Sequence, residues 1–404
     1  MQSSIATTNY DILICGGGLV GAAFAIAMEQ RGFTVAVVES KQASDRYNEA
    51  FDSRALALSP GSQAILQDLN VWQDIAAQSI ALEKVHVSRR GNFGSHILSA
   101  KKEGLSALGF VVNINQLKHA LATRCEASPK IAWLCPATVT AIEADDENAT
   151  VTILQNDKQQ TVHASLAILA EGSDLTLAKS LGFSFTEHNY HRQAYIFNVQ
   201  VDNSEKTAYE RFTKHGPLAM LPMPDNRYKC VWVLPTGVVK AYEKLDDEML
   251  LEKIQATFGY RLGRFRKLGK RLVYPLHFSY ARKQTAHRLV LLGNAAHTMH
   301  PVAGQGYNLS LRDVDVLAQV LMQAGDDFAS EKTLEIYEKK RHADQLFMTT
   351  FTHQLLTPAT SESRIASIIR SAAFIALDNC SLVRKSLLRQ TLGFTTRGDL
   401  HANV

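Results

Sequence analysis

The chain has 404 residues, of which 46% are hydrophobic and 20% charged, and its formal net charge is +4. These values are typical of a soluble globular protein with enough core for two or three domains. So small a net charge does not support electrostatic binding of nucleic acid, and we expect no nucleic-acid partner.

No segment of the sequence predicts a membrane span or a secretory signal. Residues 12–28 carry no charge, but four glycines interrupt them and they are too short to cross a bilayer. The first ten residues lack the basic and apolar regions of a signal peptide. The five cysteines form no C-x-x-C pair, which predicts neither a disulfide framework nor a zinc site. We therefore expect a reducing, cytoplasmic location.

A strand, a glycine-rich turn and a helix follow one another near the N-terminus. Residues 12–14 form a short apolar run, Gly16, Gly18 and Gly21 have the G-x-G-x-x-G spacing, and residues 22–28 are an alanine-rich helical segment. In this context Gly16 permits the tight turn and Gly18 lets a pyrophosphate approach the backbone. Gly21 lets the helix pack against the strand.

An acidic residue stands where a dinucleotide site needs one. The second apolar strand, residues 35–38, ends at Glu39. A carboxylate there accepts hydrogen bonds from both hydroxyls of an adenosine ribose, while the start of the helix binds the phosphates. The alternative is a glycine-rich turn before an ordinary buried helix. Glu39 favours a site for an adenosine diphosphate moiety, in FAD or NAD.

The next segments contain two polar candidates. Ser59 and Pro60 have the pattern of an N-cap and first helical residue. Arg54, just upstream, either reaches a phosphate or flavin edge or lies on the surface. Residues 85–100 alternate like a pair of exposed strands. Gln116, near the start of a further helix, faces either a ligand or solvent.

Two further turns follow apolar strands. Hairpin-like strands over 137–169 lead into Glu171 and Gly172, and a buried strand ends at Gly293 and Asn294. Between them, residues 186–275 are rich in aromatic and β-branched residues and predict a separate antiparallel sheet inserted into the nucleotide-binding domain.

The C-terminal segment is predicted to be helical from about residue 330. Residues 364–397 contain six basic residues and one acidic residue among apolar ones. Such a basic amphipathic segment either lies on an anionic bilayer or docks on the body with a solvated basic face.

The three turns and Glu39 resemble the class A flavoprotein monooxygenases of the p-hydroxybenzoate hydroxylase type. Residues 210–223, 258–263, 269–276 and 293–309 are also similar to the ubiquinone-biosynthesis hydroxylases. The resemblance covers nearly the whole chain. It implies an α/β fold, in which a Rossmann-like FAD-binding domain carries an inserted antiparallel β-sheet substrate domain and a helical C-terminal tail. The expected divisions are 1–80, 107–185 and 276–330 for the FAD-binding domain, 81–106 and 186–275 for the sheet, and 331–404 for the C-terminal region.

The resemblance also implies roles for single residues. It makes FAD the cofactor, with NAD(P)H and O₂ as co-substrates and a flavin C4a-hydroperoxide as the oxidant. The expected FAD-binding residues are Gly16, Gly18, Gly21, Glu39, Arg54, Gln116, Glu171, Gly172, Gly293, Asn294 and Asn308. Glu171 and Asn294 both replace an aspartate of the wider family. Asn294 accepts hydrogen bonds without charge assistance, so weaker FAD retention is expected.

The loop after the third turn is the predicted catalytic segment. Gly304, Gln305 and Gly306 open a helix, whose N–H groups and dipole would stabilise negative charge on the reduced flavin. Pro301 would stiffen the loop over the ring. His297, close to this loop, has no acid or cysteine alongside to complete a metal site, and a structural or flavin-flanking role is predicted for it.

The substrate implied by the resemblance is 2-polyprenyl-6-methoxyphenol. Its ring is expected between the flavin and the inserted sheet, with core packing as the alternative role for the candidate wall residues Phe212, Leu218, Met220 and Leu221. A polyprenyl tail requires work at the inner-membrane surface or delivery by other ubiquinone-biosynthesis proteins. The alternatives are a sister hydroxylase acting at another ring position, a flavin-dependent reductase or halogenase, and a non-catalytic flavoprotein scaffold.

Overall fold

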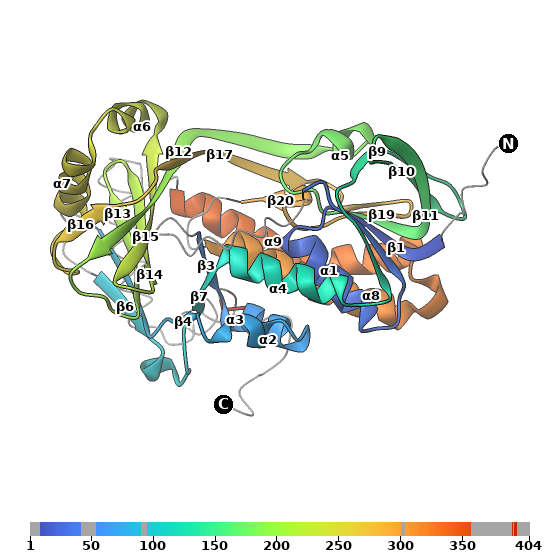
Figure 1. The fold of residues 1–404 in the computed structure, drawn as a ribbon, viewed down its shortest axis with the longest axis horizontal. Coiled ribbons are helices and arrows are strands. Elements are labelled where there is room, and N and C mark those ends of the chain that lie inside the picture. The colour runs from blue at the N-terminus through green and yellow to red at the C-terminus, as the bar shows by residue number, and fades with distance from the viewer. Residues whose placement is uncertain are drawn as a thin grey trace.

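The computed structural model describes residues 9–41, 54–89, 95–299, 304–356, 390 and 392–393. Within these ranges the molecule is elongated, with a mixed sheet and its helices at one end and a largely antiparallel sheet at the other (Figure 1). This arrangement confirms the predicted fold class. Residues 364–389, which hold most of the basic C-terminal segment, lie outside the described residues.

The first sheet has eight strands, of which five run parallel in the order β19–β11–β1–β2–β8. These five are β1 (Asn9–Cys15), β2 (Val35–Val38), β8 (Ile131–Leu134), β11 (Lys158–Leu169) and β19 (Leu289–Leu291). The other three, which pair antiparallel, are β9 (Thr138–Ala144), β10 (Ala149–Gln155) and β18 (Thr285–Ala286). Residues 12–15 are fully buried, because both faces of the parallel sheet are covered.

Helices cover one face of this sheet. They are α1 (Leu19–Glu29), α4 (Ile114–Glu126), α8 (Gln305–Ala324) and α9 (Glu331–Leu356). Ile12 and Ile14 of β1 pack on the alanine-rich face of α1. Leu13 and Cys15 point to the opposite face, where they join a core with β9, β10 and α5 (Thr176–Ser180). Alternate side chains of this one strand therefore pack into two different hydrophobic cores.

The second sheet has nine strands, in the order β20–β17–β12–β15–β14–β13–β5–β6 with β16 beside β12. They are β5 (Lys84–Arg89), β6 (Ser95–Ser99), β12 (Phe185–Val201), β13 (Thr207–Thr213), β14 (Gly216–Met223), β15 (Arg227–Pro235), β16 (Phe265–Leu268), β17 (Leu272–Ala281) and β20 (His297–Thr298). Helices α6 (Thr236–Glu243) and α7 (Asp247–Phe258) cover its outer face. The long strands β12 and β17 pair along most of their length and connect the two ends of the molecule (Figure 1).

A third, small sheet lies beside the first. It consists of β3 (Ala55–Leu58), β4 (Ile80–Ala81) and β7 (Phe110–Asn113), with β7 in the middle. Ser59 caps α2 (Pro60–Asp68), its Oγ accepting a hydrogen bond from the Ser62 N–H at 3.2 Å, as the Ser-Pro pattern predicts. The remaining short helices are α3 (Trp72–Ala76), η1 (Lys101–Glu103), η2 (Gly293–Ala295) and η4 (Gly325–Asp327).

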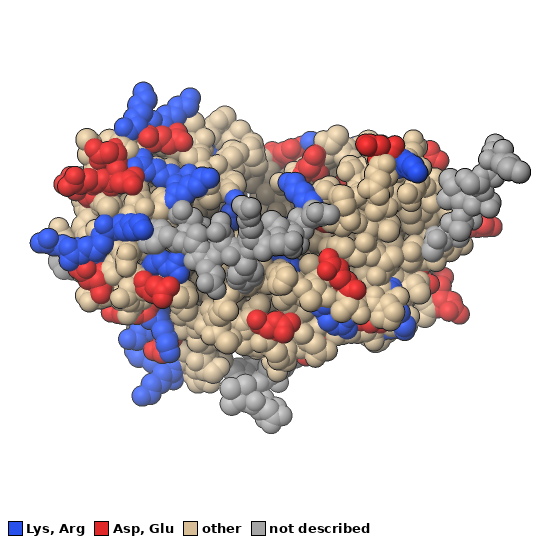
Figure 2. Space-filling model, in the orientation of Figure 1, with Lys and Arg blue, Asp and Glu red and all other residues tan. Residues whose placement is uncertain are grey.

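The surface carries charges of both signs. Figure 2, in the orientation of Figure 1, shows lysine and arginine side chains gathered at the end that holds α6, α7 and β6, with acidic side chains among them. Among the helices of the described ranges, none combines the length and the apolar character that crossing a membrane requires.

The turn between β1 and α1 depends on the lack of a side chain at Gly21. A Cβ at this position would lie 1.9 Å from the carbonyl oxygen of Gly16. That distance is far inside van der Waals contact, and both groups are backbone, so no side-chain rotation relieves it. A Cβ at Gly18, by contrast, would have no atom within 4 Å, and the φ angle of −67° suits any residue.

We predict that Gly21→Ala lowers the free energy of unfolding by at least about 3 kcal/mol, because α1 must move away from β1. The matched variant Gly18→Ala is expected to stay within about 1 kcal/mol of the wild type. Chemical denaturation of the two purified variants measures the difference. Equal midpoints would contradict this account of the turn.

Candidate active site

The three predicted turns meet at one edge of the first sheet. They follow β1, β11 and β19, which are adjacent parallel strands, so their carboxyl ends lie side by side. Backbone hydrogen bonds continue the ladder into the turns, from Ala170 N–H to Cys15 O at 2.8 Å and from Leu292 N–H to Leu169 O at 2.9 Å. The topology therefore brings together segments that lie far apart in the chain.

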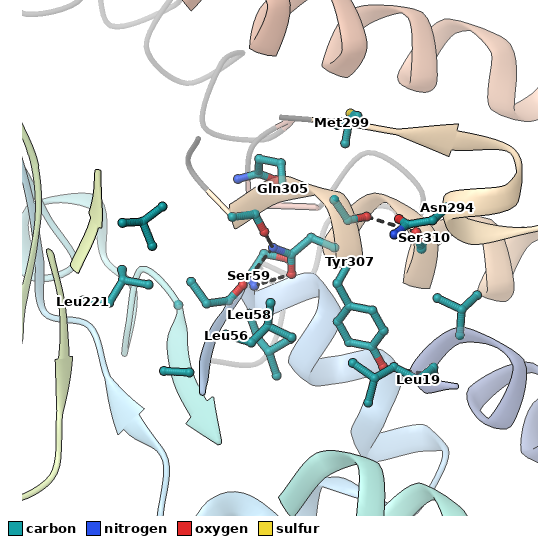
Figure 3. Close-up of a pocket in the computed structure, with 18 of the residues that line it drawn as sticks. Leu19, Leu56, Leu58, Ser59, Leu221, Asn294, Met299, Gln305, Tyr307 and Ser310 are labelled. Carbon is teal, nitrogen blue, oxygen red and sulfur yellow. Dashed lines mark hydrogen bonds between the residues drawn. The ribbon is translucent and has the colours of Figure 1, made fainter. Parts of the chain in front are cut away.

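A central cavity of about 970 Å³ begins at these turns and extends to the inner face of the second sheet. Figure 3 shows its walls, with Leu19 beside the first turn, Asn294 at the third, Gln305 and Ser310 on α8, and Leu221 pointing in from β14. The volume is at the upper end of the usual range for small-molecule sites. It suits a large cofactor that leaves room for a substrate ring.

The first turn presents backbone to the cavity. Gly16 has a φ angle of +106°, and a Cβ there would lie 2.6 Å from the carbonyl oxygen of Ala170, so both positive φ and close packing require glycine. Gly18 lines the cavity as the N-cap of α1, with no side chain capping the helix. Gly21 lies behind the turn, outside the cavity lining. The open space at Gly18 is where an anion can meet the helix N-terminus.

Glu39 follows β2 and faces the same end of the cavity. Its Oε2 accepts a hydrogen bond from the Gly17 N–H and its Oε1 one from the Lys41 N–H, both at 2.8 Å. A carboxylate oxygen has more than one acceptor position, so these bonds orient the side chain and leave it able to accept others.

The second and third turns contribute an acid and an amide. Partial desolvation raises the pKa of Glu171 to about 7, and the nearby Asp174 carboxylate adds to the rise. Gly172 beside it has a φ angle of +84° and also lines the cavity. Asn294 is exposed to the cavity, whereas Gly293 is buried against Val20.

The start of α8 forms part of the cavity wall. Gly304 adopts the left-handed conformation as its N-cap, and Gly304, Gln305 and Gly306 all line the cavity. Gln305 is 8% exposed, and its Oε1 has no hydrogen-bond partner among the described residues. Pro301, the other predicted catalytic residue, lies outside the described residues.

Asn308 fixes this loop rather than projecting freely into the cavity. Its Oδ1 accepts from the Ser59 N–H at 2.8 Å, and its Nδ2 donates to the carbonyl oxygens of Ala57 and Gly304 at 3.0 and 2.9 Å. Tyr307 makes a second connection, its hydroxyl donating to the Leu19 carbonyl at 3.4 Å. Side chains of α8 thus tie its first turn to the small sheet and to α1 (Figure 3).

A buried charge network connects α8 to β20 and α9. His297 Nε2 and Arg341 Nε lie 2.5 Å from the two carboxylate oxygens of Asp313. Burial opposes ionisation of Asp313, but the charges of Arg341 and His297 outweigh it and hold its pKa below the usual range. Within the described ranges, no group of three or more His, Cys, Asp or Glu side chains is arranged to bind a metal.

Besides Gly21 and Gly293, two other predicted FAD-binding residues, Arg54 and Gln116, do not line the cavity. Arg54 lies 5.6 Å above the ring of Tyr274, and its guanidinium donates to the Tyr274 hydroxyl at 2.5 Å. It immediately precedes β3, next to Ala55, which lines the cavity. Gln116 lies on α4, away from the cavity wall.

Two predicted substrate-wall residues require correction. Leu218 and Met220 are fully buried in the core between the second sheet and its outer helices. Because side chains alternate along β14, the residues that reach the cavity are Ala219 and Leu221, and Phe212 lines it from β13. Leu218 and Met220 therefore have the core-packing role, and only Leu221 and Phe212 remain as wall residues.

Several ionisable side chains that sequence reasoning missed also line the cavity, and Lys229 and Glu210 are two of them. Lys229 on β15 lines the cavity and donates to the Ala55 carbonyl at 2.5 Å. Burial, together with the charge of Arg54, lowers the pKa of Lys229 to about 8. Glu210 on β13 also lines the cavity, and burial raises its pKa to about 7. No local sequence pattern marked them, because their place on the cavity wall depends on the register of the paired strands.

Comparison with known proteins identifies the family. Residues 9–352 match the family described as FAD binding domain. The chain is 31% identical to ubiquinone hydroxylase UbiL of Rhodospirillum rubrum, over 95% of this chain and 89% of the relative. The chain belongs to this family of FAD-binding monooxygenases. The predicted cofactor FAD and the predicted enzyme class are thereby confirmed.

A second relative and a solved structure are also similar to this chain. The chain is 28% identical to 3-demethoxyubiquinol 3-hydroxylase of Escherichia coli, over 95% of this chain and 98% of the relative. Its fold is similar to that of p-nitrophenol 4-monooxygenase PnpA from Pseudomonas putida. That structure superposes with a TM-score of 0.78 and 18% identity, over 96% of this chain and 98% of the other.

The cavity of this FAD-binding monooxygenase fits its cofactor. The open space at Gly18 would hold the diphosphate, and Glu39 would hold the adenosine ribose. The unpartnered Oε1 of Gln305 is a buried acceptor that a donor of the flavin ring would satisfy. We assign these roles as proposals from the geometry.

We predict that Glu210→Gln stabilises the protein at alkaline pH. Below the ordinary pKa of a glutamate both states are protonated. As the pH rises towards 7 the unfolded carboxyl ionises first, so the wild type loses stability. The free energy of unfolding, measured by denaturation at each pH, should be higher for the variant by on the order of 2 kcal/mol at pH 8 and by less at pH 5. An advantage that does not change with pH would contradict the raised pKa.

Proposed function

We propose that this enzyme hydroxylates the aromatic ring of a polyprenylated phenol in ubiquinone biosynthesis, with O₂ and NAD(P)H as co-substrates. The observation that carries the proposal is the continuity of the cavity, from the three turns of the FAD-binding end to the inner face of the second sheet. The names of the relatives, which are ubiquinone hydroxylases, support this class of substrate.

The sheet side of the cavity suits a ring with an apolar tail. Its lining there is mainly aliphatic, from Val85, Val87, Leu98, Ile196, Leu221 and Val231. Each buried CH₂ contributes roughly 0.8 kcal/mol, so isoprene units gain from entering such a wall. The same term holds the rest of a long tail in a bilayer, and we therefore propose that the enzyme works peripherally at the inner membrane, alone or with other proteins of the pathway.

The residues of the chain would position the substrate ring and exclude water from the site. Bound reduced flavin supplies two electrons and delivers one oxygen atom of O₂ to the ring. The N-terminus of α8 would stabilise negative charge on that ring through its N–H groups and dipole. The apolar wall of the second sheet would hold the substrate ring in position and keep water from the reaction.

We propose 2-polyprenyl-6-methoxyphenol as the substrate. A sister reaction at another ring position is the second candidate, because the chain is also similar to a 3-demethoxyubiquinol 3-hydroxylase. Both reactions need a phenolic ring beside the flavin. They differ in which ring carbon faces it.

Oxidation of NAD(P)H with ¹⁸O₂ tests the proposal. With a short-chain 2-prenyl-6-methoxyphenol, we expect substrate-stimulated NAD(P)H oxidation and one ¹⁸O atom in the product, whose ring position mass spectrometry and NMR identify. A reductase would consume NAD(P)H without labelling the product, and a scaffold would consume none. Either result would contradict the proposed function.

A further inference from the structure

A single carboxyl group interrupts the apolar inner face of the second sheet. The registers place Val87 opposite Glu210, Glu210 opposite Ala219, and Ala219 opposite Val231 on successive strands. All of these residues line the cavity, as does His96, which lies opposite Val87 on β6. Glu210 therefore stands in the middle of a cross-strand row, with aliphatic or alanine side chains on both sides.

The fold leaves one oxygen of the Glu210 carboxyl group without a partner in the part of the chain that the structure describes. Its Oε1 is buried and has no hydrogen-bond partner among the described residues. A buried polar atom without a partner costs free energy, which a bond made to a ligand would recover. Because the side chain of Glu210 also lines the cavity, its carboxyl group lies where a bound ligand can complete its bonding.

The other ionisable groups that this sheet contributes to the cavity have hydrogen-bond partners or lie at the end of the row. The Tyr209 hydroxyl donates to Glu205 at 3.1 Å, and Lys229 donates to the Ala55 carbonyl at 2.5 Å. His96 lies at the end of the row, on β6. Glu39 and Glu171 are at the nucleotide end, beside the turns of the first sheet.

We propose that Glu210 is the catalytic base that accepts the proton of the substrate's phenolic hydroxyl, an inference that rests on the proposed function. The O–H bond breaks, its proton moves to Glu210, and the oxygen's electron pair increases electron density at the ring carbon that is attacked. That carbon gains the oxygen atom and then loses its hydrogen as a proton, while Glu210 returns a proton to the phenolic oxygen. The two electrons of NAD(P)H reduce the second atom of O₂ to water, and the overall reaction takes up one proton from solvent.

The electrostatics of the site agree with this role. Burial raises the pKa of Glu210 to about 7, so near neutral pH the group both accepts and returns a proton. An ordinary surface glutamate is too weak a base to take a phenolic proton with comparable efficiency.

Glu210→Gln tests the assignment, with a short-chain 2-prenyl-6-methoxyphenol as the probe. We expect formation of hydroxylated product to fall by roughly 10²-fold or more, while FAD content is retained and NAD(P)H oxidation continues with release of hydrogen peroxide. Wild-type kcat should rise with pH through about 7, and the variant should lose this step. A fluorinated, more acidic phenol should recover part of the lost rate, which a merely structural defect would not allow.

Glu187→Gln, at an exposed ion pair with Lys179 outside the cavity, is the matched control and should keep the wild-type rate and pH profile. If Glu210→Gln does not retain FAD, Glu210→Asp decides, with a moved apparent pKa expected in kcat. An unchanged product yield and pH profile in the Glu210 variants would overturn the role of Glu210 alone. A wild type that forms no hydroxylated product would overturn the proposed function, and this assignment with it.

Discussion

A turn of only three residues separates the end of β1 from the start of α1, and this is possible only because Gly21 has no side chain to meet the Gly16 carbonyl oxygen. A Cβ would lie 1.9 Å from that oxygen. The close contact places the N-terminus of α1 at the carboxyl edge of the sheet. There the turns after β11 and β19 lie beside it, since these strands are its parallel neighbours. The rest of the cofactor site follows from this edge.

The two walls of the cavity have separate tasks, and their relative position is fixed in two ways. Strands β12 and β17 run through the second sheet and towards the first, so the sheet that contributes Glu210 and Leu221 is held by continuous backbone. The buried network around Asp313 anchors α8 to β20 through His297 and to α9 through Arg341. A buried charge that loses its partner is strongly destabilising, so this network is sensitive to any single substitution.

The local features were predictable because each depends on a few consecutive residues. The glycine turns, the Ser59 cap and the strand pair at 85–100 all appear where sequence patterns indicate them. Leu218 and Met220 could not be assigned in this way. Both faces of β14 are covered, so its apolar run carries no sign of which alternate residues point to the cavity.

The position of the polar groups on the sheet wall could not be predicted from the sequence either. Glu210 gains its significance from Val87 and Ala219, which the topology brings beside it from distant parts of the chain. Arg54 shows the converse, because this cation, for which the sequence left a ligand-facing or a surface role open, contacts Tyr274 of β17. Long-range pairing determines both outcomes, and a local pattern contains no information about it.

Comparison of FAD with FMN binding tests the central claim most directly, because the account assigns the adenosine and diphosphate contacts to Gly18 and Glu39. Titration of flavin-free protein, followed by flavin fluorescence and calorimetry, should give one FAD per chain and an affinity at least 100-fold above that for FMN. Equal affinity for the two flavins, or no binding of FAD by folded protein, would contradict the account.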